Sequence, residues 1–171
     1  MSERTGLVTF QGNPLTLVGN AVALNQKAPD FTALKPDLSP VTLADYAGKK
    51  LIIASVPSLD TSVCSIETKR FNDEAKNLGD DVELVVISMD LPFAQARWAE
   101  EYKAREVTMI SDHRDASFGN AYGVLIKELR LLARAVFVIN TKGEVCFESI
   151  VKEMTDEPDY KAVLDAVRAA S

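Results

Sequence analysis

The chain has 171 residues, of which 47% are hydrophobic, and a formal net charge of -6 at pH 7. This length and composition suit one folded domain over residues 1–171 and argue against an intrinsically disordered chain. The acidic balance argues against a nucleic-acid partner, and the lack of a signal-peptide pattern or an apolar run of roughly 20 residues predicts a cytoplasmic protein without a membrane partner.

The first predicted element is a β-hairpin over residues 7–18, in which two apolar stretches flank the turn Gln11-Gly12-Asn13-Pro14. Shorter extended stretches follow at 30–34 and 41–43, with a polar loop between them. Residues 50–56 are almost continuously apolar, which is typical of a strand that is buried on both faces. A central sheet is therefore expected to begin here.

A helix is predicted to begin near Cys64, shortly after Pro57 breaks that strand, and Gly79 is well placed to end it. Side chains that share one helical face recur along this stretch: Cys64, Thr68, Phe71, Ala75 and Leu78. Cys64 is therefore expected in the first turn.

The pattern then alternates between strands and helices. Residues 82–89 and 107–111 are predicted to be strands. Pro92 suits the first turn of a helix that reaches about Lys103, and a short helix is expected over 116–122. This alternation is typical of βαβ units with parallel strands.

The last part of the chain predicts two antiparallel strands and a final helix. Residues 133–139 and 144–150 are joined by Asn140-Thr141-Lys142-Gly143, which is a hairpin-type connection. Pro158 opens an amphipathic helix with Val163, Leu164 and Val167 inside. Together the elements predict an α/β, thioredoxin-like fold, with a mixed central sheet flanked by helices and an N-terminal hairpin.

The candidate chemistry lies between Pro57 and Cys64, where the chain leaves the carboxyl end of a central strand. Ligands of such sheets bind beyond the carboxyl ends of the strands. Free backbone N–H groups and the dipole of a helix N-terminus favour a thiolate over a thiol. Cys64 is therefore predicted to be a reactive nucleophile.

Three other side chains could assist this thiol. Thr61 can cap the helix and direct its hydroxyl toward the sulfur, and Pro57 stiffens the turn and could shield the thiol. Arg134 interrupts an apolar strand over 131–138, and a buried arginine needs an anionic partner. Arg134 could therefore stabilise negative charge at the site, or could serve only in a structural ion pair.

The spacing Pro57-xxx-Thr61-xx-Cys64 resembles the PxxxTxxC signature of the peroxiredoxins, and Arg134 matches the active-site arginine of that family. Further stretches are similar to the bacterial thiol peroxidase subfamily and extend the resemblance over nearly the whole chain: residues 10–14, 58–64, 90–97, 132–136 and 157–160.

The resemblance implies a thiol-dependent peroxidase that reduces hydrogen peroxide and alkyl hydroperoxides through a sulfenic acid on Cys64. It also implies recycling by thioredoxin or another thiol, and a homodimer. In the subfamily a second, resolving cysteine captures the sulfenic acid, but Ala99 stands at that position, after Arg97-Trp98. The usual intramolecular disulfide cannot form there.

Three explanations of Ala99 are open: a natural one-cysteine cycle, a replacement of the resolving residue, or resolution by Cys146. Cys146 lies within a predicted strand and is expected to pack as a small hydrophobe. Cys64 and Cys146 are the only cysteines and His113 is the only histidine, so neither a disulfide scaffold nor a Cys/His zinc site is expected, and no cofactor is predicted.

Other residues near the motif have simpler interpretations. Asp60 is expected in a turn or cap, because a carboxylate beside the sulfur would oppose ionisation. Trp98 and Phe93 are expected to pack a helix face, in a region that the resemblance suggests lines an apolar entrance. His113 is expected in a solvated loop.

Two other functions are weighed against a peroxidase. Thiol–disulfide exchange usually relies on a CxxC pair, whereas position 61 is threonine. A redox sensor or interaction module would form a mixed disulfide through Cys64 with little turnover. The absence of a resolving cysteine at position 99 counts in favour of this second alternative.

Overall fold

Two β-sheets organise the chain, one of seven strands and one of four. The computed structural model describes all 171 residues. In chain order the elements are β1 (Glu3–Phe10), β2 (Asn13–Val18), β3 (Thr32–Leu34), β4 (Pro40–Thr42), the short 3-10 helix η1 (Leu43–Tyr46), β5 (Lys50–Ser55), α1 (Ser62–Ala75), β6 (Val82–Ser88), α2 (Pro92–Tyr102), β7 (Thr108–Ser111), α3 (Ser117–Ala121), β8 (Leu125–Ile126), β9 (Leu131–Leu132), β10 (Ala135–Ile139), β11 (Val145–Ile150) and α4 (Tyr160–Ala169). None of the helices combines the length and the apolarity that crossing a membrane requires.

The seven-stranded sheet has the order β11-β10-β5-β6-β7-β3-β4. Strands β5, β6 and β7 are parallel to one another. Strand β10 pairs antiparallel with both β5 and β11, and β3 pairs antiparallel with β7 and β4. The predicted mixed, thioredoxin-like sheet is therefore confirmed.

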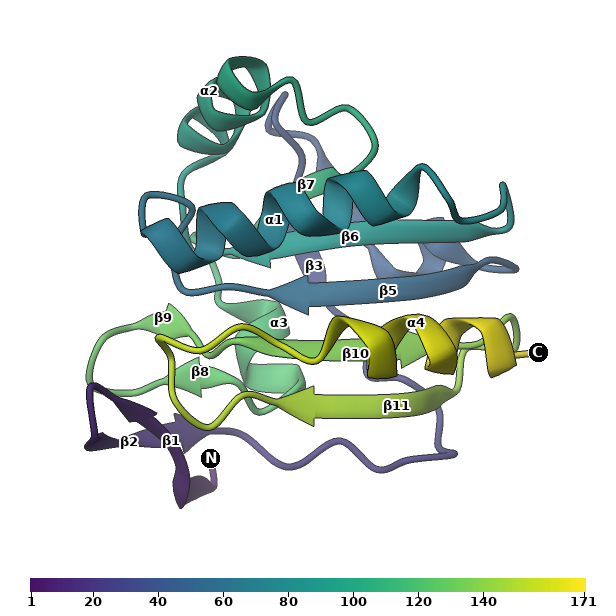
Figure 1. Ribbon diagram of the computed structural model, residues 1–171. Helices are drawn as coiled ribbons and strands as arrows, with labels where there is room; N and C mark the ends of the chain where they lie inside the picture. The colour runs from purple at the N-terminus through teal and green to yellow at the C-terminus, as the bar shows by residue number, and fades with distance from the viewer.

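Helices cover both faces of this sheet, with α1 and α4 crossing the face turned toward the viewer in Figure 1. On that face Ile52 of β5 packs into an apolar cluster with Phe71 of α1 and Val163 of α4. The neighbouring Ile53 points to the other face and joins a cluster with Phe118 of α3. The prediction that this strand is buried on both faces is confirmed.

The predicted N-terminal hairpin is present as β1 and β2. Its turn residues Gln11 and Gly12 have φ angles of 49° and 81°, a conformation that glycine adopts without strain and that matches the twist of hairpin strands. The hairpin continues into β8 and β9 as a four-stranded sheet, and Leu17 and Ile126 of this sheet belong to the same apolar cluster as Phe118. The two sheets therefore share a core.

Three predicted boundaries are wrong. Helix α1 ends at Ala75 and not near Gly79, because the following amides bond to carbonyls three residues back and tighten the chain into turns. Helix α4 begins after Asp159, whose carboxylate caps its first turn. The strand expected over 131–138 is two strands in different sheets, β9 and β10, and Arg134 lies at the bend between them.

Candidate active site

Cys64 lies in the first turn of α1, directly beyond the carboxyl end of β5. Thr61 is the N-cap of this helix, and its hydroxyl accepts from the Cys64 amide at 3.4 Å. The same hydroxyl donates to the Ser58 carbonyl at 2.9 Å. Thr61 is therefore the predicted cap, but its side chain is exposed and its hydrogen bonds go to backbone groups.

Asp90 anchors the loop before α1. Its carboxylate accepts from the Ser58 hydroxyl at 2.7 Å and from the Leu59 amide at 2.8 Å. Asp90 follows β6, which runs parallel to β5, so the carboxyl ends of both strands meet at one edge of the sheet. The buried Pro57 begins this loop, and Asp90 fixes the path from there to the helix. Sequence reasoning missed this role of Asp90.

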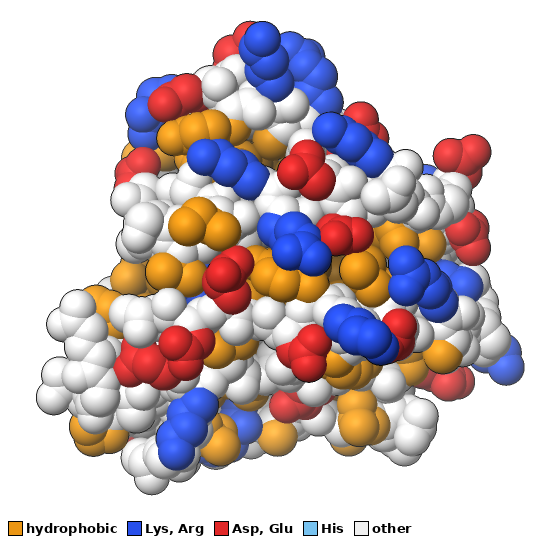
Figure 2. All heavy atoms as spheres, viewed as in Figure 1, with side chains coloured by type: hydrophobic (Ala, Val, Ile, Leu, Met, Phe, Trp, Pro, Cys, Tyr) orange, Lys and Arg blue, Asp and Glu red, His pale blue; other side chains and the backbone are white.

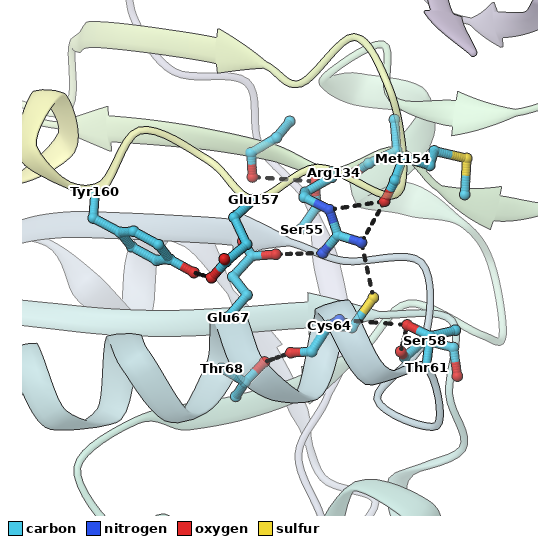
Figure 3. Close-up of polar contacts among 12 residues, drawn as sticks. Ser55, Ser58, Thr61, Cys64, Glu67, Thr68, Arg134, Met154, Glu157 and Tyr160 are labelled. Carbon is cyan, nitrogen blue, oxygen red and sulfur yellow. Dashed lines mark hydrogen bonds and ion pairs between the residues drawn. The ribbon is translucent and has the colours of Figure 1, made fainter. Parts of the chain in front are cut away.

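Arg134 reaches the sulfur from the opposite side of the site (Figure 3). Its Nη2 donates to Cys64 Sγ at 3.3 Å, and both residues are buried. Strand β10 runs antiparallel to β5, and the pairing of Ala135 with Ser55 brings the residue just before β10 to the carboxyl end of β5. The Ser55 hydroxyl also donates to the Ala133 carbonyl at 2.7 Å, which holds the bend that presents Arg134.

Glu67 is the anionic partner that a buried Arg134 requires. Arg134 Nη1 donates to Glu67 Oε2, and the side chains of both residues are almost completely buried. Glu67 follows Cys64 by three residues on α1, so the two side chains share a helical face. The expected anion is present, but sequence reasoning did not identify it. The spacing of three residues from Cys64 was the available signal.

The third partner of the guanidinium is a backbone carbonyl. Met154 O accepts from Arg134 Nε at 3.2 Å and from Nη2 at 2.7 Å. Each nitrogen of the guanidinium thus has a fixed acceptor. Nη2 donates both to a carbonyl and to the sulfur. Arg134 is therefore held rigidly beside Cys64.

The electrostatics of the buried pair favour a charged Arg134. Burial raises the pKa of Glu67 to about 7 even though the Arg134 guanidinium opposes this rise, and the nearby Glu157 adds to it. Burial also opposes the charge on Arg134, but Glu67 and Cys64 outweigh it, so the pKa of Arg134 lies above its ordinary value. Glu67 Oε1 is buried without a hydrogen-bond partner. The cation beside the sulfur is thus permanent, whereas Glu67 is the group that can titrate.

Cys146 does not lie beside Cys64. It is half-buried near the start of β11, where its Sγ contacts the Val138 carbonyl at 3.4 Å, and burial raises the pKa of its thiol. The strand register places Cys146 level with Leu51, at the amino end of β5, whereas Cys64 lies beyond Ser55 at the other end. The separation along the sheet is about 10 Å or more, beyond the reach of a disulfide without backbone movement.

Ala99 lies on α2, half-buried against the apolar cluster that also contains Cys64. Its neighbour Trp98 is buried, and Trp98 Nε1 donates to Ser65 Oγ at 3.1 Å, which ties α2 to α1. Phe93 is 65% exposed, so the expectation that it packs a helix face is wrong. It is the second residue of α2, in the first turn of the helix.

A hollow of about 510 Å³ opens between α1 and α2 beside the active-site loop. Asp60 and Arg97 form an exposed ion pair at 3.2 Å across its edge, which fits a loop role for Asp60. His113 is half-buried in the turn between β7 and α3 and has no contact with the site residues. No cluster of three or more His, Cys, Asp or Glu side chains has the arrangement of a metal site.

The arrangement suits nucleophilic chemistry at sulfur. A guanidinium at 3.3 Å from Cys64 Sγ can stabilise negative charge on the sulfur and on an atom that the sulfur attacks. The first turn of α1 adds backbone N–H groups at the same place.

Comparisons with known proteins cover most of the chain. A family model described as Redoxin matches residues 23–164. A thiol peroxidase of Halalkalibacterium halodurans is 55% identical over 163 residues, covering 95% of this chain and 98% of that protein. A thiol peroxidase of Bacillus subtilis is 51% identical over 162 residues, covering 95% of this chain and 96% of that protein. The crystal structure of a peroxiredoxin-like protein from Aquifex aeolicus matches with a TM-score of 0.89 and 40% identity, over 96% of each chain.

The buried carboxyl of Glu67 generates a prediction about pH. Its folded-state pKa is raised, so it stabilises the fold while protonated, and this contribution is lost as the pH rises through about 7. Between about pH 5.5 and about 8, the native chain should therefore lose about 2 kcal/mol of unfolding free energy relative to Glu67→Gln, which cannot titrate. Urea unfolding at both pH values measures this difference. Parallel pH dependences of the two proteins would contradict the assignment.

Proposed function

The chain belongs to the Redoxin family and is a thiol-dependent peroxidase of the peroxiredoxin type, and from that premise we propose that Cys64 is its peroxidatic nucleophile, with Arg134, Thr61 and Pro57 completing the site. The observation that carries this assignment is the 3.3 Å contact between Arg134 Nη2 and Cys64 Sγ, with both residues buried. No other thiol in the chain has a neighbouring cation at hydrogen-bond distance.

The substrates are a hydroperoxide and a thiol reductant. In the first step the Cys64 thiolate attacks the distal oxygen of the hydroperoxide and the O–O bond breaks. Cys64 becomes a sulfenic acid, and the leaving alkoxide takes a proton to become an alcohol, or water in the case of hydrogen peroxide. Arg134 lies where the breaking bond develops negative charge, and preorganised donors at such positions supply much of an enzyme's rate enhancement.

Access to the sulfur requires some movement, because Cys64 has no exposed surface. The loop from Pro57 to Thr61 leads into the helix turn that carries Cys64, and its outer part, Asp60 and Thr61, is exposed. A small peroxide needs only a local opening of this loop. Hydrogen peroxide and alkyl hydroperoxides are the proposed substrates.

In the second half of the cycle an external thiol attacks the sulfenic sulfur and releases water. A further thiol then breaks the mixed disulfide and restores Cys64. Position 99 has no thiol, and the thiol of Cys146 is too far away to reach the sulfenic acid. The proposed reductant is therefore thioredoxin or a small thiol. A continuous supply of reduced thiols favours the cytoplasm as the site of action. Residues 1–171 are proposed to act as one domain.

Substitution at Cys64 and Arg134 tests the proposed site. Cumene hydroperoxide followed by dimedone should give a covalent adduct in the native chain and in Cys146→Ser, but none in Cys64→Ser, as read by intact mass. Arg134→Met should slow the oxidation of Cys64 by roughly 100-fold to 1,000-fold, the usual cost of one preorganised donor. If Cys64→Ser still turned over peroxide, Cys64 could not be the peroxidatic nucleophile. An adduct without turnover by thioredoxin or dithiothreitol would instead favour a redox sensor.

Ala99→Cys tests the role of the missing resolving thiol. Position 99 packs against the same apolar cluster as Cys64, so a thiol there can meet the sulfenic acid once the helix ends loosen. Peroxide should then yield an intramolecular disulfide in place of the dimedone adduct, visible as a loss of two hydrogens by mass. A variant that is labelled by dimedone as strongly as the native chain would show that position 99 cannot resolve Cys64.

We also propose that two copies pair through the face beside the active-site loop. Figure 2 shows apolar surface near the hollow between α1 and α2, among charges of both signs. Ile66 and Tyr102 line this hollow and remain exposed, as do Leu91 and Phe93 at the start of α2. Burying such a patch against its symmetry mate would remove apolar area from water.

Light scattering at micromolar concentration should give twice the chain mass of 18.7 kDa. Phe93→Glu places a charge in the proposed interface and should shift the protein to the monomer mass. An exposed glutamate on α4, such as Lys161→Glu, serves as the control and should leave the mass unchanged. A native chain that is monomeric under these conditions would overturn the pairing.

A further inference from the structure

The segment that follows β11 supports Arg134 on two sides. The Val151 amide donates to the Arg134 carbonyl at 2.9 Å. Three residues later, the Met154 carbonyl accepts two hydrogen bonds from the Arg134 side chain, at 3.2 and 2.7 Å. Apart from a single bridge, this segment belongs to no helix or strand, so its position depends on the groups that hold it.

The N-terminal hairpin holds the segment from the other side. The Thr9 amide of β1 donates to the Lys152 carbonyl at 2.7 Å, and the Met154 amide donates to the Thr9 carbonyl at 2.9 Å. Figure 1 shows the loop after β11 passing beside the β1–β2 hairpin. The same residue, Met154, is thus fixed by the hairpin through its N–H and by Arg134 through its C=O.

The carboxylate of Glu153 closes this arrangement. Its Oε1 accepts from the Thr9 hydroxyl and from the Gly12 amide, each at 2.9 Å. Its Oε2 accepts from the amide and the hydroxyl of Thr155, at 2.9 and 2.8 Å. The backbone amides of Gly12 and Thr155 are the main reason that the pKa of Glu153 is lowered to about 2. The carboxylate therefore stays ionised and joins the tip of the hairpin to residues 153–155.

We propose that Glu153 is a positioning residue of the peroxidase: by fastening the hairpin tip onto residues 152–155 it fixes the Met154 carbonyl, and through that carbonyl the Arg134 guanidinium that contacts Cys64. This inference rests on the proposed function of Cys64 and Arg134. Glu153 itself touches neither the sulfur nor the guanidinium. It acts by keeping one acceptor in place.

The physical reason lies in how the guanidinium is shared. Nη2 contacts both Met154 O and Cys64 Sγ, whereas Nη1 contacts Glu67. If the carbonyl moves, the guanidinium loses the acceptor on the side of the sulfur and follows its remaining anionic partner, Glu67. A shift of about 1 Å at a reacting group can cost as much as 100-fold in rate.

The chain offers a matched control for this idea. Glu128 also binds the hairpin through its carboxylate, and both of its oxygens accept from the Thr16 amide of β2, at 3.0 and 2.9 Å. Its pKa is lowered mainly by that backbone hydrogen bond, as for Glu153. Glu128, however, makes no contact with residues 151–155. Its substitution loosens the hairpin without reaching Met154.

The test compares Glu153→Gln with Glu128→Gln. The NH₂ group of a glutamine at position 153 would face two hydrogen-bond donors that now bind one carboxylate oxygen. The substitution therefore weakens the link between the hairpin tip and residues 153–155. We expect Cys64 oxidation by cumene hydroperoxide, followed by stopped flow, to slow by roughly 10-fold in E153Q and by less than about twofold in E128Q. Alkylation of Cys64 by iodoacetamide at neutral pH, which reports the thiolate, should slow in E153Q alone. Equal effects of the two substitutions would overturn the proposal.

A double-mutant cycle separates positioning from general loss of stability. In an Arg134→Met background the cost of E153Q should fall to less than about twofold, because the group through which Glu153 acts is gone. An E153Q cost that persists in this background would overturn the proposal. If instead Arg134→Met alone has no effect, the proposed role of Arg134 fails, and the inference about Glu153, which rests on that role, is overturned with it. Should E153Q not fold, Thr9→Val removes one of the four hydrogen bonds and should give a smaller loss that is also absent in the Arg134→Met background.

Discussion

Burying the guanidinium of Arg134 obliges the fold to supply acceptors for all of its donors, and the surroundings of Cys64 follow from that requirement. Glu67 supplies a carboxylate from α1, and Met154 supplies a backbone carbonyl from the loop after β11. The sulfur of Cys64 accepts from Nη2 of the guanidinium at 3.3 Å. Because each of its three nitrogens donates to a fixed acceptor, the guanidinium is held beside the thiol, so the site is preorganised before a peroxide arrives.

The topology explains why residues so far apart in the sequence meet. The carboxyl ends of β5 and β6 present the Cys64 loop and its anchor Asp90 at one edge of the sheet. Because β10 is antiparallel to β5, its first residue lies at that same edge and brings Arg134 with it. The hairpin sheet then braces the far side of Arg134 through the segment around Met154. Both sheets, and not only the central one, therefore contribute to the site.

Much of this could be predicted from local patterns. The apolar strands, the helix start at Cys64, the Thr61 cap and the need of a buried Arg134 for an anion depend on neighbours in sequence, and all are present in the structure. The acid that pairs with Arg134 was not predicted, because many acidic residues compete and the spacing of Glu67 from Cys64 was its only local signal. The Met154 carbonyl carries no side-chain signal, and the two-residue strands β8 and β9 are too short for a periodic pattern. The bend at Arg134 could not be predicted, because the apolar residues on both sides of it look like one continuous strand.

The central proposal is that the Arg134 guanidinium, at 3.3 Å, stabilises negative charge on the Cys64 sulfur, and the ultraviolet absorbance of a thiolate tests it directly. The native protein at neutral pH should absorb more than Cys64→Ser in the thiolate band, and Arg134→Met should lose most of that difference while keeping its fold by circular dichroism. A thiolate band of equal size in the native protein and Arg134→Met would contradict the claim. It would place the stabilisation of the sulfur in the first turn of α1 alone.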